Sequence, residues 1–463
     1  MSKITDGGQP IAQLDVRPPP PEDDLSEAEG EGESSLVRHL PRTFDALLFG
    51  PFRWYLSALI FWNAAMSMQM LTRGYLAYDL TDSFTSLGVL SLASALPMLA
   101  LSPFGGVLAD RLSRRVVLQV GQGFGLLMAL AVATLIFAGQ LTFQALFLAS
   151  VGQGTMMALV MPSRQAFLPE VVGMRRLMNA IPLQSASMNL MQIIAPAAGG
   201  FMIDWIGAGP VYVAMAVMYA LSMTTLFAVK SLSSAEFARE ADAQAASTGR
   251  RRGNRGASRG GGRGTALNDL ASGFRYLFRN PVLLSVLSFT LLGSVLGMPI
   301  RRLLPGYVAD VFADSGTALG VMQMGMGLGA LAGALALATV RFDRNRGLVF
   351  AGSALLMGTS LLLFSFTGVF WLAWIALALV GVGTSGRQAL GQMLMQDYVD
   401  DEYRGRVMSI YMMQISLMNV GTFFVSLYMD RVGPEFAIGS LGATLIVATI
   451  AYLTFVPRFR RLA

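Results

Sequence analysis

The sequence lacks the side chains that most enzymes use for nucleophilic or metal chemistry. It contains no cysteine, which excludes disulfides, thiolate metal sites and cysteine nucleophiles. Its one histidine, His39, lies outside the hydrophobic part of the chain, which disfavours a histidine metal site or catalytic triad. A Walker-type phosphate loop is absent, which disfavours direct use of ATP. We therefore expect no catalytic residue, no metal and no cofactor, and a protein that is not an enzyme.

Charge is also scarce, because only 13% of the residues are charged and 54% are hydrophobic. A soluble domain carries about 25% charged residues. Apolar runs of twenty or more residues separate the charged segments, and each can cross about 30 Å of hydrocarbon. We predict an all-α membrane protein in the lipid bilayer, with twelve transmembrane helices at residues 54–78, 84–108, 116–138, 141–163, 178–203, 208–229, 281–303, 316–340, 347–367, 369–391, 405–429 and 436–456.

Basic residues recur in every second loop between these spans. Apart from a strongly basic loop between the sixth and seventh spans, they are Arg111, Arg114, Arg115, Arg164, Arg175, Arg176, Arg341, Arg344, Arg346, Arg404, Arg406, Arg458, Arg460 and Arg461. The other loops are short and nearly free of basic residues, with Arg431 as the clear exception. Positive loops stay on the cytoplasmic side. We therefore predict a multi-pass protein of the cell (inner or cytoplasmic) membrane with both termini in the cytoplasm.

Composition divides the chain into five segments. Residues 1–45 are rich in proline and acidic residues and predict a disordered cytoplasmic tail. Six-helix bundles are expected at 46–229 and 281–457, and 458–463 form a basic cytoplasmic tail. The linker at 230–280 is basic and rich in Arg and Gly. Such tracts bind RNA or anionic lipid, but a flexible tether is the favoured reading, and we expect no nucleic-acid partner.

The two halves repeat one another. Gly74–Ala77 matches Gly306–Ala309 at an offset of 306 − 74 = 232, and Asp204 with Gly207 matches Asp430 with Gly433 at an offset of 226. Further matches fall between these in the same order. Each repeat holds an even number of spans, so both insert in the same orientation. This arrangement predicts two parallel six-helix repeats with a binding site between them, as in transporters that work by alternating access.

The loop after the second span resembles the signature loop of the major facilitator superfamily through Gly106, Asp110, Arg111, Arg114 and Arg115. The fifth span carries Pro196, Gly199 and Gly200, which resemble the G-P-x-x-G-G motif of exporters and antiporters. Two further stretches, Met161–Glu170 and Arg404–Ser409, are similar to the enterobactin-exporter-like branch, also called transmembrane secretion effectors. Leu148 departs from the family, because many proton-coupled exporters have an arginine there.

The resemblance implies a conformational latch around the signature loop. We expect the Asp110 carboxylate to cap the cytoplasmic start of the eleventh span and to pair with a nearby arginine, since helix N-termini stabilise anions. The alternative is an interfacial aspartate that only marks a helix end. The second repeat keeps Asp343 and Arg344 at the equivalent place. Asp82 and Asp314 precede the second and eighth spans and are predicted to be their N-caps.

The resemblance also implies that the first and seventh spans face a central cavity, so Arg73, Arg301 and Arg302 are candidates for its lining. Snorkelling of these arginines to lipid headgroups is the alternative. Arg164 and Arg387 are candidates from the inner ends of the fourth and tenth spans. The remaining polar candidates are Asn63, Gln69, Gln184, Asn189, Gln192, Gln323, Gln388, Gln414 and Asn419. Interhelical hydrogen bonding is the alternative for each of them. The pairs Gln184/Asn189 and Gln414/Asn419 are the better candidates, because both repeats keep them on helices near the cavity.

Carboxylates are absent from the middle of the spans, so the cavity is expected to suit an anionic or neutral amphiphile better than a cation. We predict a monomeric secondary active exporter of a small amphiphilic metabolite or drug, siderophore-like, with protons as the counter-ion. Uptake or flipping of a lipid-like substrate is an alternative. A non-transporting receptor or scaffold, in which the tail and linker are the working parts, is a third reading.

Overall fold

The computed structural model describes most of the hydrophobic part of the chain, namely residues 45–229, 263–312, 315–339, 345–400, 402–456 and 459. Inside these ranges, the side chains of residues 45, 46, 103, 106–111, 174, 175, 263–270 and 415 are not described. Nearly all of the two expected tails, and the linker up to residue 262, therefore lie outside the described residues.

Every element assigned within the described residues is a helix, which confirms the all-α fold. The helices are α2 (Asp45–Leu48), α3 (Gly50–Asp79), α4 (Phe84–Arg111), α5 (Arg114–Phe137), α6 (Phe143–Ile206), α7 (Ala208–Ala228), α9 (Arg263–Arg279), α10 (Pro281–Gly297), α11 (Ile300–Val311), α12 (Gly316–Thr339), α13 (Arg346–Phe366), α14 (Phe370–Tyr398), α15 (Arg404–Met412), α16 (Gln414–Val432) and α17 (Pro434–Phe455).

Eleven stretches of helix among the described residues are long and apolar enough to cross a membrane. The first predicted span is not among them, but it corresponds to α3, whose 30 residues reach about 45 Å at 1.5 Å per residue. Its hydropathy is lower because Asn63, Gln69 and Arg73 interrupt it, and all three side chains are buried. Polar side chains within a spanning helix face protein or a cavity. The polar side of α3 therefore points into the protein.

One predicted loop is absent, and one predicted span contains a break. A loop was expected at residues 164–177, but α6 is helical through this stretch except at Gly173, whose φ of 68° and ψ of 168° break the helix. Glycine adopts such a positive φ without strain. The predicted seventh span is two helices, because α10 ends at Gly297 and α11 begins at Ile300. Pro299 lies at this break, and proline lacks the N–H that would continue the helical ladder.

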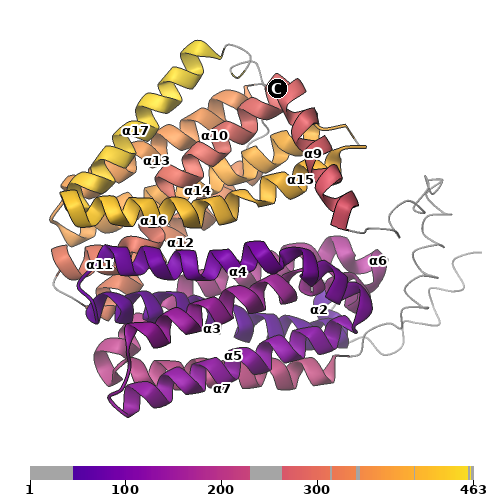
Figure 1. Ribbon diagram of the computed structural model, residues 1–463, viewed down its shortest axis with the longest axis vertical. Coiled ribbons are helices and arrows are strands. Elements are labelled where there is room, and N and C mark those ends of the chain that lie inside the picture. The colour runs from indigo at the N-terminus through magenta and orange to yellow at the C-terminus, as the bar shows by residue number, and fades with distance from the viewer. Residues whose placement is uncertain are drawn as a thin grey trace, which may run out of the picture. The chain divides into compact units, whose positions relative to one another are not determined.

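The spanning helices form two groups, one in the lower half and one in the upper half of the view in Figure 1. We call α3–α7 the N-terminal group and α10–α17 the C-terminal group. In the N-terminal group, α3 packs against α6 and α7, and α5 packs against α7. In the C-terminal group, α14 packs against α12 and α13, and α13 also packs against α17.

The most extensive contacts between the groups are those of α6 with α12 and of α4 with α16. Glycines make both contacts possible. A Cβ added to Gly200 of α6 would overlap the backbone of Gly316 on α12, and one added to Gly88 of α4 would overlap Ser426 on α16. Small residues let the backbones of spanning helices approach closely. These two helix pairs therefore meet nearly backbone to backbone.

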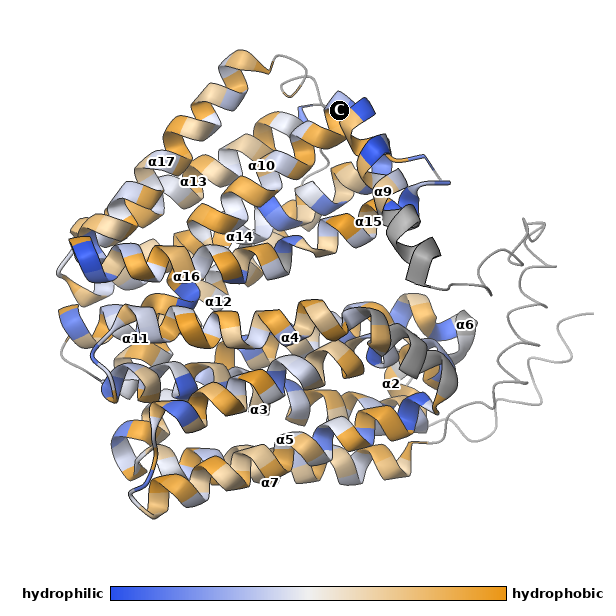
Figure 2. Cartoon of the chain, viewed as in Figure 1, coloured by the Kyte–Doolittle hydropathy of each residue, from blue (hydrophilic) through white to orange (hydrophobic). Residues whose placement is uncertain are grey.

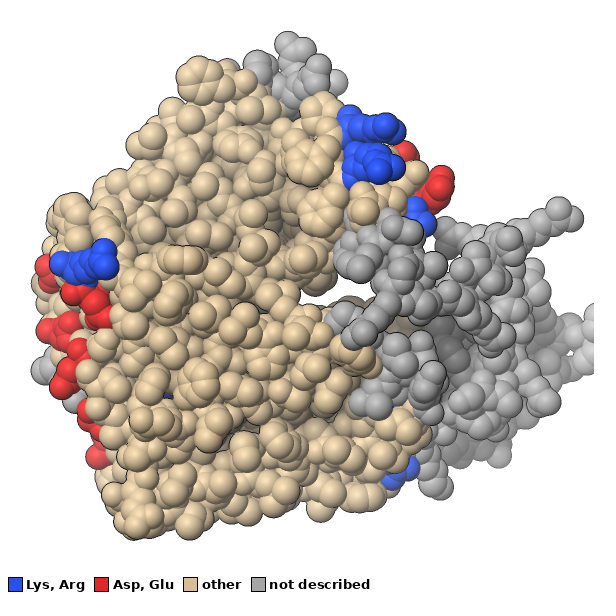
Figure 3. All heavy atoms as spheres, in the orientation of Figure 1, with Lys and Arg blue, Asp and Glu red and all other residues tan. Residues whose placement is uncertain are grey.

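Charged residues gather at the two ends of the spanning helices. Figure 2 shows apolar residues along the helices and hydrophilic residues mainly toward their ends. In Figure 3, acidic residues gather at the left edge and most visible basic residues lie at the right. We call the end at which α4 and α12 begin the acidic end, and the opposite end the basic end. Figure 3 also shows a hollow between the two groups, toward the basic end.

The buried core joins the two groups near the acidic end. One cluster of buried apolar residues contains Tyr78 and Phe84 of the N-terminal group together with Leu304 and Tyr307 of the C-terminal group. A second cluster, around Phe289, draws its described members from α9 and the C-terminal helices. Apolar burial stabilises contact in proportion to area. Packing therefore holds the groups together more firmly at the acidic end.

Candidate substrate-binding cavity

A cavity of about 330 Å³ lies between the two groups and is lined by residues of α3, α4, α6, α11 and α16. Its lining residues are Trp62, Asn63, Met66, Ser67, Met70, Arg73, Ser94, Met98, Gln153, Gly154, Met157, Met161, Arg164, Met188, Gln192, Arg301, Arg302 and Asn419. Most of them belong to the N-terminal group. A concave, mainly apolar site with a few converging polar groups is the usual form of a small-molecule site.

Six methionines form much of the wall: Met66, Met70, Met98, Met157, Met161 and Met188. Methionine is unbranched and polarisable, so a wall of this kind adapts to apolar ligands of different shapes. The apolar part of a ligand would contact these side chains, because they offer dispersion contacts and place no hydrogen-bonding demand on it.

Four arginines also line the cavity, from three helices: Arg73, Arg164, Arg301 and Arg302. The hydrogen-bond acceptors of three of them are neutral amides. Arg73 donates to Gln153, Arg164 donates to Asn63 Oδ1 at 3.0 Å, and Arg301 donates to Gln192 Oε1 at 3.0 Å.

Among the described residues that line the cavity, none is an aspartate or a glutamate. Charges away from bulk water interact strongly, and uncompensated ones are costly. The cavity therefore carries a concentrated positive potential that an anion would neutralise.

A chain of amides holds Arg73 in place. Gln153 of α6 accepts from Arg73, and its amide nitrogen donates to Gln69 Oε1 of α3 at 3.3 Å. The Tyr219 hydroxyl of α7 donates to the same oxygen at 3.1 Å. Three helices thus fix the guanidinium through neutral partners, which leaves its positive charge available to a ligand.

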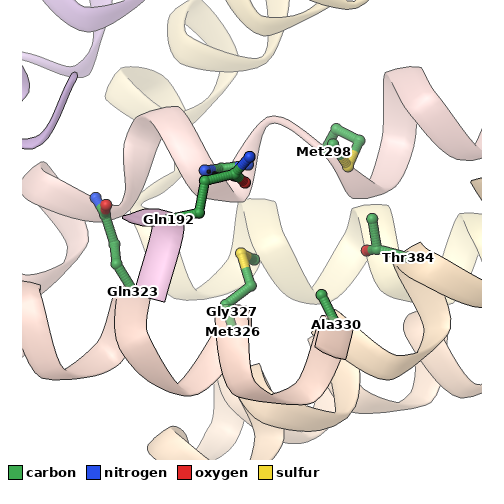
Figure 4. A pocket seen from close by; sticks show the side chains of 9 residues that line it. Gln192, Met298, Gln323, Met326, Gly327, Ala330 and Thr384 are labelled. Atoms are coloured by element: carbon green, nitrogen blue, oxygen red, sulfur yellow. Dashed lines mark hydrogen bonds between the residues drawn. The ribbon is translucent and has the colours of Figure 1, made fainter. Parts of the chain in front are cut away.

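A small pocket of about 60 Å³ adjoins the cavity and shares Gln192 and Arg301 with it. Figure 4 shows its lining, with Gln192 from α6 facing the α11–α12 region and Met298, Met326 and Thr384 around the space. The hydrogen bond between Arg301 and Gln192 therefore lies between the two spaces. Movement of either side chain would join them.

The structure places only some of the predicted candidates on the cavity. Asn63, Arg73, Arg164, Gln192, Arg301, Arg302 and Asn419 line it. Gln69 accepts a hydrogen bond from Gln153, the partner of Arg73, and Gln323 lines the small pocket. Gln184, Asn189, Gln388 and Gln414 are not among the lining residues. The two predicted pairs therefore contribute unequally, because Asn419 lines the cavity whereas Asn189 does not.

The expectation for Arg387 is wrong. Its side chain is only 2% exposed and lies inside the C-terminal group, where Nη1 donates to the Thr290 carbonyl at 2.8 Å and to Ser294 Oγ at 3.2 Å. Gly293 makes room for it, because a Cβ there would lie 2.6 Å from the Arg387 Cδ. The arginine fills a gap between α14 and α10 instead of reaching the cavity.

Most of the latch predicted around the signature loop lies outside the described residues. This applies to the surroundings of Gly106, to the side chains of Asp110 and Arg111 and to the whole of Asp343 and Arg344. The two remaining members stay within the N-terminal group. Arg114 pairs with Glu170 at 2.8 Å and donates to the Ala166 carbonyl at 2.9 Å. Arg115 donates to the Phe227 carbonyl.

The exporter-type motif lies at the contact between α6 and α12. Gly200 packs against Gly316, and a Cβ added to Gly320 would lie 2.7 Å from the Pro196 carbonyl oxygen. Gly199 faces Met68 of α3 at ordinary contact distance. The motif therefore makes a helix crossing between the two groups, and close approach requires its Gly200.

The prediction that Asp82 caps the second span is wrong, because the first N–H groups of α4 donate instead to Asp430 of α16. Asp314 lies outside the described residues, and the start of α12 is capped by Asp204 of α6. Sequence reasoning considered only neighbours along the chain. The paired positions of Asp204 and Asp430 in the repeat were the signal that could have revealed these contacts.

Sequence reasoning also missed Gln153, Tyr219 and the individual methionines of the cavity wall. Gln153 lies in Gly152–Thr155, a stretch that matches Gly381–Thr384 of the second repeat, and that match was the available signal. Leu148, at the position where the resemblance led us to look for the arginine of many proton-coupled exporters, is 67% exposed and is not among the residues that line the cavity. The positive charge of this cavity therefore comes from α3, α11 and the inner part of α6.

A cavity with converging arginines between two groups of membrane-length helices is the arrangement expected of a membrane transporter. The model of the Major Facilitator Superfamily matches residues 53–422, and the chain belongs to this family. The protein is accordingly a multi-pass membrane transporter and not an enzyme.

Relatives with assigned names match parts of the chain. It is 32% identical over 139 residues to the "Quinolone resistance protein NorA" of Staphylococcus aureus (strain MRSA252), which covers 30% of this chain and 34% of NorA. It is 27% identical over 212 residues to the "Uncharacterized MFS-type transporter YfiS" of Bacillus subtilis (strain 168), covering 45% of this chain and 44% of YfiS. The matches thus span less than half of either relative.

Solved structures of transporters share the fold. The nucleoside transporter NupG superposes with a TM-score of 0.65 at 12% identity, covering 87% of this chain and 98% of NupG. A D-xylose-proton symporter superposes with a TM-score of 0.64 at 14% identity, covering 90% of this chain and 99% of the symporter. At these identities the likeness shows the fold alone.

Proposed function

We propose that this protein is a secondary active exporter of small amphiphilic molecules that carry negative charge. The observation that supports this most directly is the cavity, where four arginines face six methionines and no carboxylate is present among the lining residues. An anionic group would bind the arginines by charge-assisted hydrogen bonds, which are about twice as strong as neutral ones. The apolar part would lie on the methionine wall. A siderophore-like metabolite or a drug of this charge type belongs to the class.

Export is favoured by two further observations. The NorA relative is named for quinolone resistance, and the motif Pro196, Gly199 and Gly200 resembles that of exporters and antiporters. We assign the basic end to the cytoplasm, because positive loops stay there. We take the hollow between the two groups toward the basic end as the route by which a cytoplasmic substrate reaches the cavity.

Alternating access follows if residues 46–229 and 281–457 rock as two units about the cavity between them. We propose that inward movement of protons drives the cycle. The described part of the lining includes no carboxylate, so we place the coupling proton on a group outside it. The protein would work as a monomer, because the cavity is formed within one chain.

The test is a flux assay in proteoliposomes whose lumen is either more acidic or more alkaline than the medium. It compares an amphiphilic anion, anilinonaphthalene sulfonate, with a lipophilic cation, tetraphenylphosphonium. Both probes are permanently charged, so a pH gradient alone does not redistribute them by titration. We expect the sulfonate to accumulate in vesicles with an acidic lumen and not with the opposite gradient. The Arg301→Gln/Arg302→Gln double variant should lose this flux, while the exposed control Arg279→Gln should keep it.

Transport of the lipophilic cation with no effect of the cavity substitutions would contradict the charge assignment. Equal sulfonate flux under both gradients would contradict proton coupling. Movement only into vesicles with an alkaline lumen would instead support symport with protons.

A further inference from the structure

The acidic end contains two helix caps that cross between the groups and mirror one another. Asp430 Oδ1 accepts from the Phe84 N–H at 2.8 Å, and its Oδ2 accepts from the Thr85 N–H at 2.7 Å and the Ser83 hydroxyl at 2.8 Å. The carboxylate of α16 therefore binds three donors at the start of α4. All of these donors belong to the other group of helices.

The second cap has the same pattern. Asp204 Oδ1 accepts from the Gly316 N–H at 2.7 Å, and its Oδ2 accepts from the Thr317 N–H at 2.8 Å and the Ser315 hydroxyl at 2.6 Å. Here a carboxylate of the N-terminal group, on α6, binds the start of α12. Each group thus supplies one capping carboxylate and contains one helix start that is capped by the other group.

The local backbone presents each carboxylate in the same way. Gly207 and Gly433 follow the two aspartates by three residues and end α6 and α16 with φ of 86° and 87°. Only glycine adopts these angles readily. Each aspartate therefore lies in the last turn of its helix, beside the first turn of the helix that it caps.

The caps require that the two groups touch at the acidic end. The first N–H groups of a helix have no partner within the helix, and an anion beside them is stabilised by the helix dipole. The bonds form only while α6 touches α12 and α4 touches α16, the crossings where Gly200 and Gly88 allow nearly direct backbone contact. Separation of the groups at the acidic end would leave two helix starts and two carboxylates without these partners.

We propose that Asp204 and Asp430 form a reciprocal latch that keeps the acidic end of the transporter closed, and that both caps break when this end opens. The hydrogen bond between Tyr78 and Asp310 also crosses between the groups at this end and adds to the closure. The inference rests on the fold and the contacts, and it requires no particular substrate.

Absence of cysteine from the chain allows a clean test. Spin labels on Gln140→Cys and Gly368→Cys, in exposed loops of the two groups at the acidic end, report the separation of the groups by double electron–electron resonance. In Asp204→Asn/Asp430→Asn we expect the population with long distances to rise by at least about twofold, because loss of charge weakens both caps and shifts the equilibrium. Asparagine keeps the shape of the side chain.

The control is Asp397→Asn, which makes the same charge change in an ion pair with Arg346 inside the C-terminal group. It should leave the distances unchanged. Each single variant keeps one cap and should give an intermediate shift, which also guards against a double variant that fails to fold. Unchanged distances in the two single variants would overturn the latch. This measurement uses no substrate, so a negative result would leave the proposed export of anions untouched. Failure of the flux assay would likewise leave the latch untouched.

Discussion

The two groups of helices match at the acidic end and differ around the cavity. At the acidic end, Asp204 and Asp430 make the same three contacts with the same kinds of donor. Around the cavity, most lining residues come from the N-terminal group. The two repeats thus share the contacts by which the groups meet and differ in the residues that line the cavity.

The first helix of each repeat shows this difference. At the offset of 232, Pro299 corresponds to Ser67, since 299 − 232 = 67, and Pro305 corresponds to Arg73. The N-terminal repeat therefore has one unbroken helix, α3, where the C-terminal repeat has α10 and α11 with a break between them. The cavity arginines of the two helices occupy different positions in the repeat, so the positive charge is not symmetric.

The largest expected difference concerns the two inner arginines. Arg164→Met should weaken binding of anilinonaphthalene sulfonate by about tenfold or more, because a hydrogen bond to a charged group is worth roughly 1.5–3 kcal/mol. Arg387→Met should change it by less than about twofold, because that side chain lies outside the cavity. Fluorescence titration of purified protein measures both. Equal losses would mean that Arg387 reaches the ligand and that the two arginines are equivalent.

An intermediate effect, on thermal stability, is expected at the contact between α6 and α12. Gly200→Ala would place a Cβ into the Gly316 backbone, and overpacking of this kind costs about 1–3 kcal/mol. The midpoint of thermal unfolding in detergent should therefore fall. Gly352→Ala is the matched control, because no atom lies within 4 Å of its Cβ position. If both variants unfold at the same temperature, the contact between α6 and α12 is looser than the structure indicates.

The smallest effect is expected at the helix break. Pro299→Ala restores an N–H that can donate toward the carbonyl four residues earlier, so α10 and α11 should become more like the continuous α3. This would turn Arg301 and Arg302 slightly and lower sulfonate affinity by about two- to threefold. The titration that compares Arg164 with Arg387 measures it. A gain in affinity would show that the break holds these arginines away from the ligand.

Much of the fold follows from patterns that are local in the sequence. Apolar runs predict the spans, and the constant offset between matching segments predicts two parallel repeats. The errors have a physical origin in each case. Arg164 and Arg175 suggested a loop, but α6 continues through them and breaks only at Gly173. Hydropathy does not distinguish a polar residue in a loop from one that faces a cavity.

The candidate site was predictable only in part. Arg73, Arg301 and Arg302 were expected on the cavity because the family resemblance implies that the first and seventh spans face it, and the structure places them there. Arg387 has the same chemistry and a similar position in the sequence, yet it packs against Thr290 and Ser294. The difference depends on how the helices are rotated, and Gly293 is the local sign of the space that Arg387 fills.

The sequence by itself determined the class of the protein. Scarce charge, absent cysteine and twelve apolar stretches leave a helical membrane protein, because the bilayer requires backbone polar groups to be satisfied within each span. Tertiary structure alone decided which helix start each aspartate caps and which arginines meet in one cavity. The caps join residues more than one hundred positions apart, and the cavity arginines come from three different helices. Both therefore depend on helix rotation and packing rather than on any pattern of neighbours.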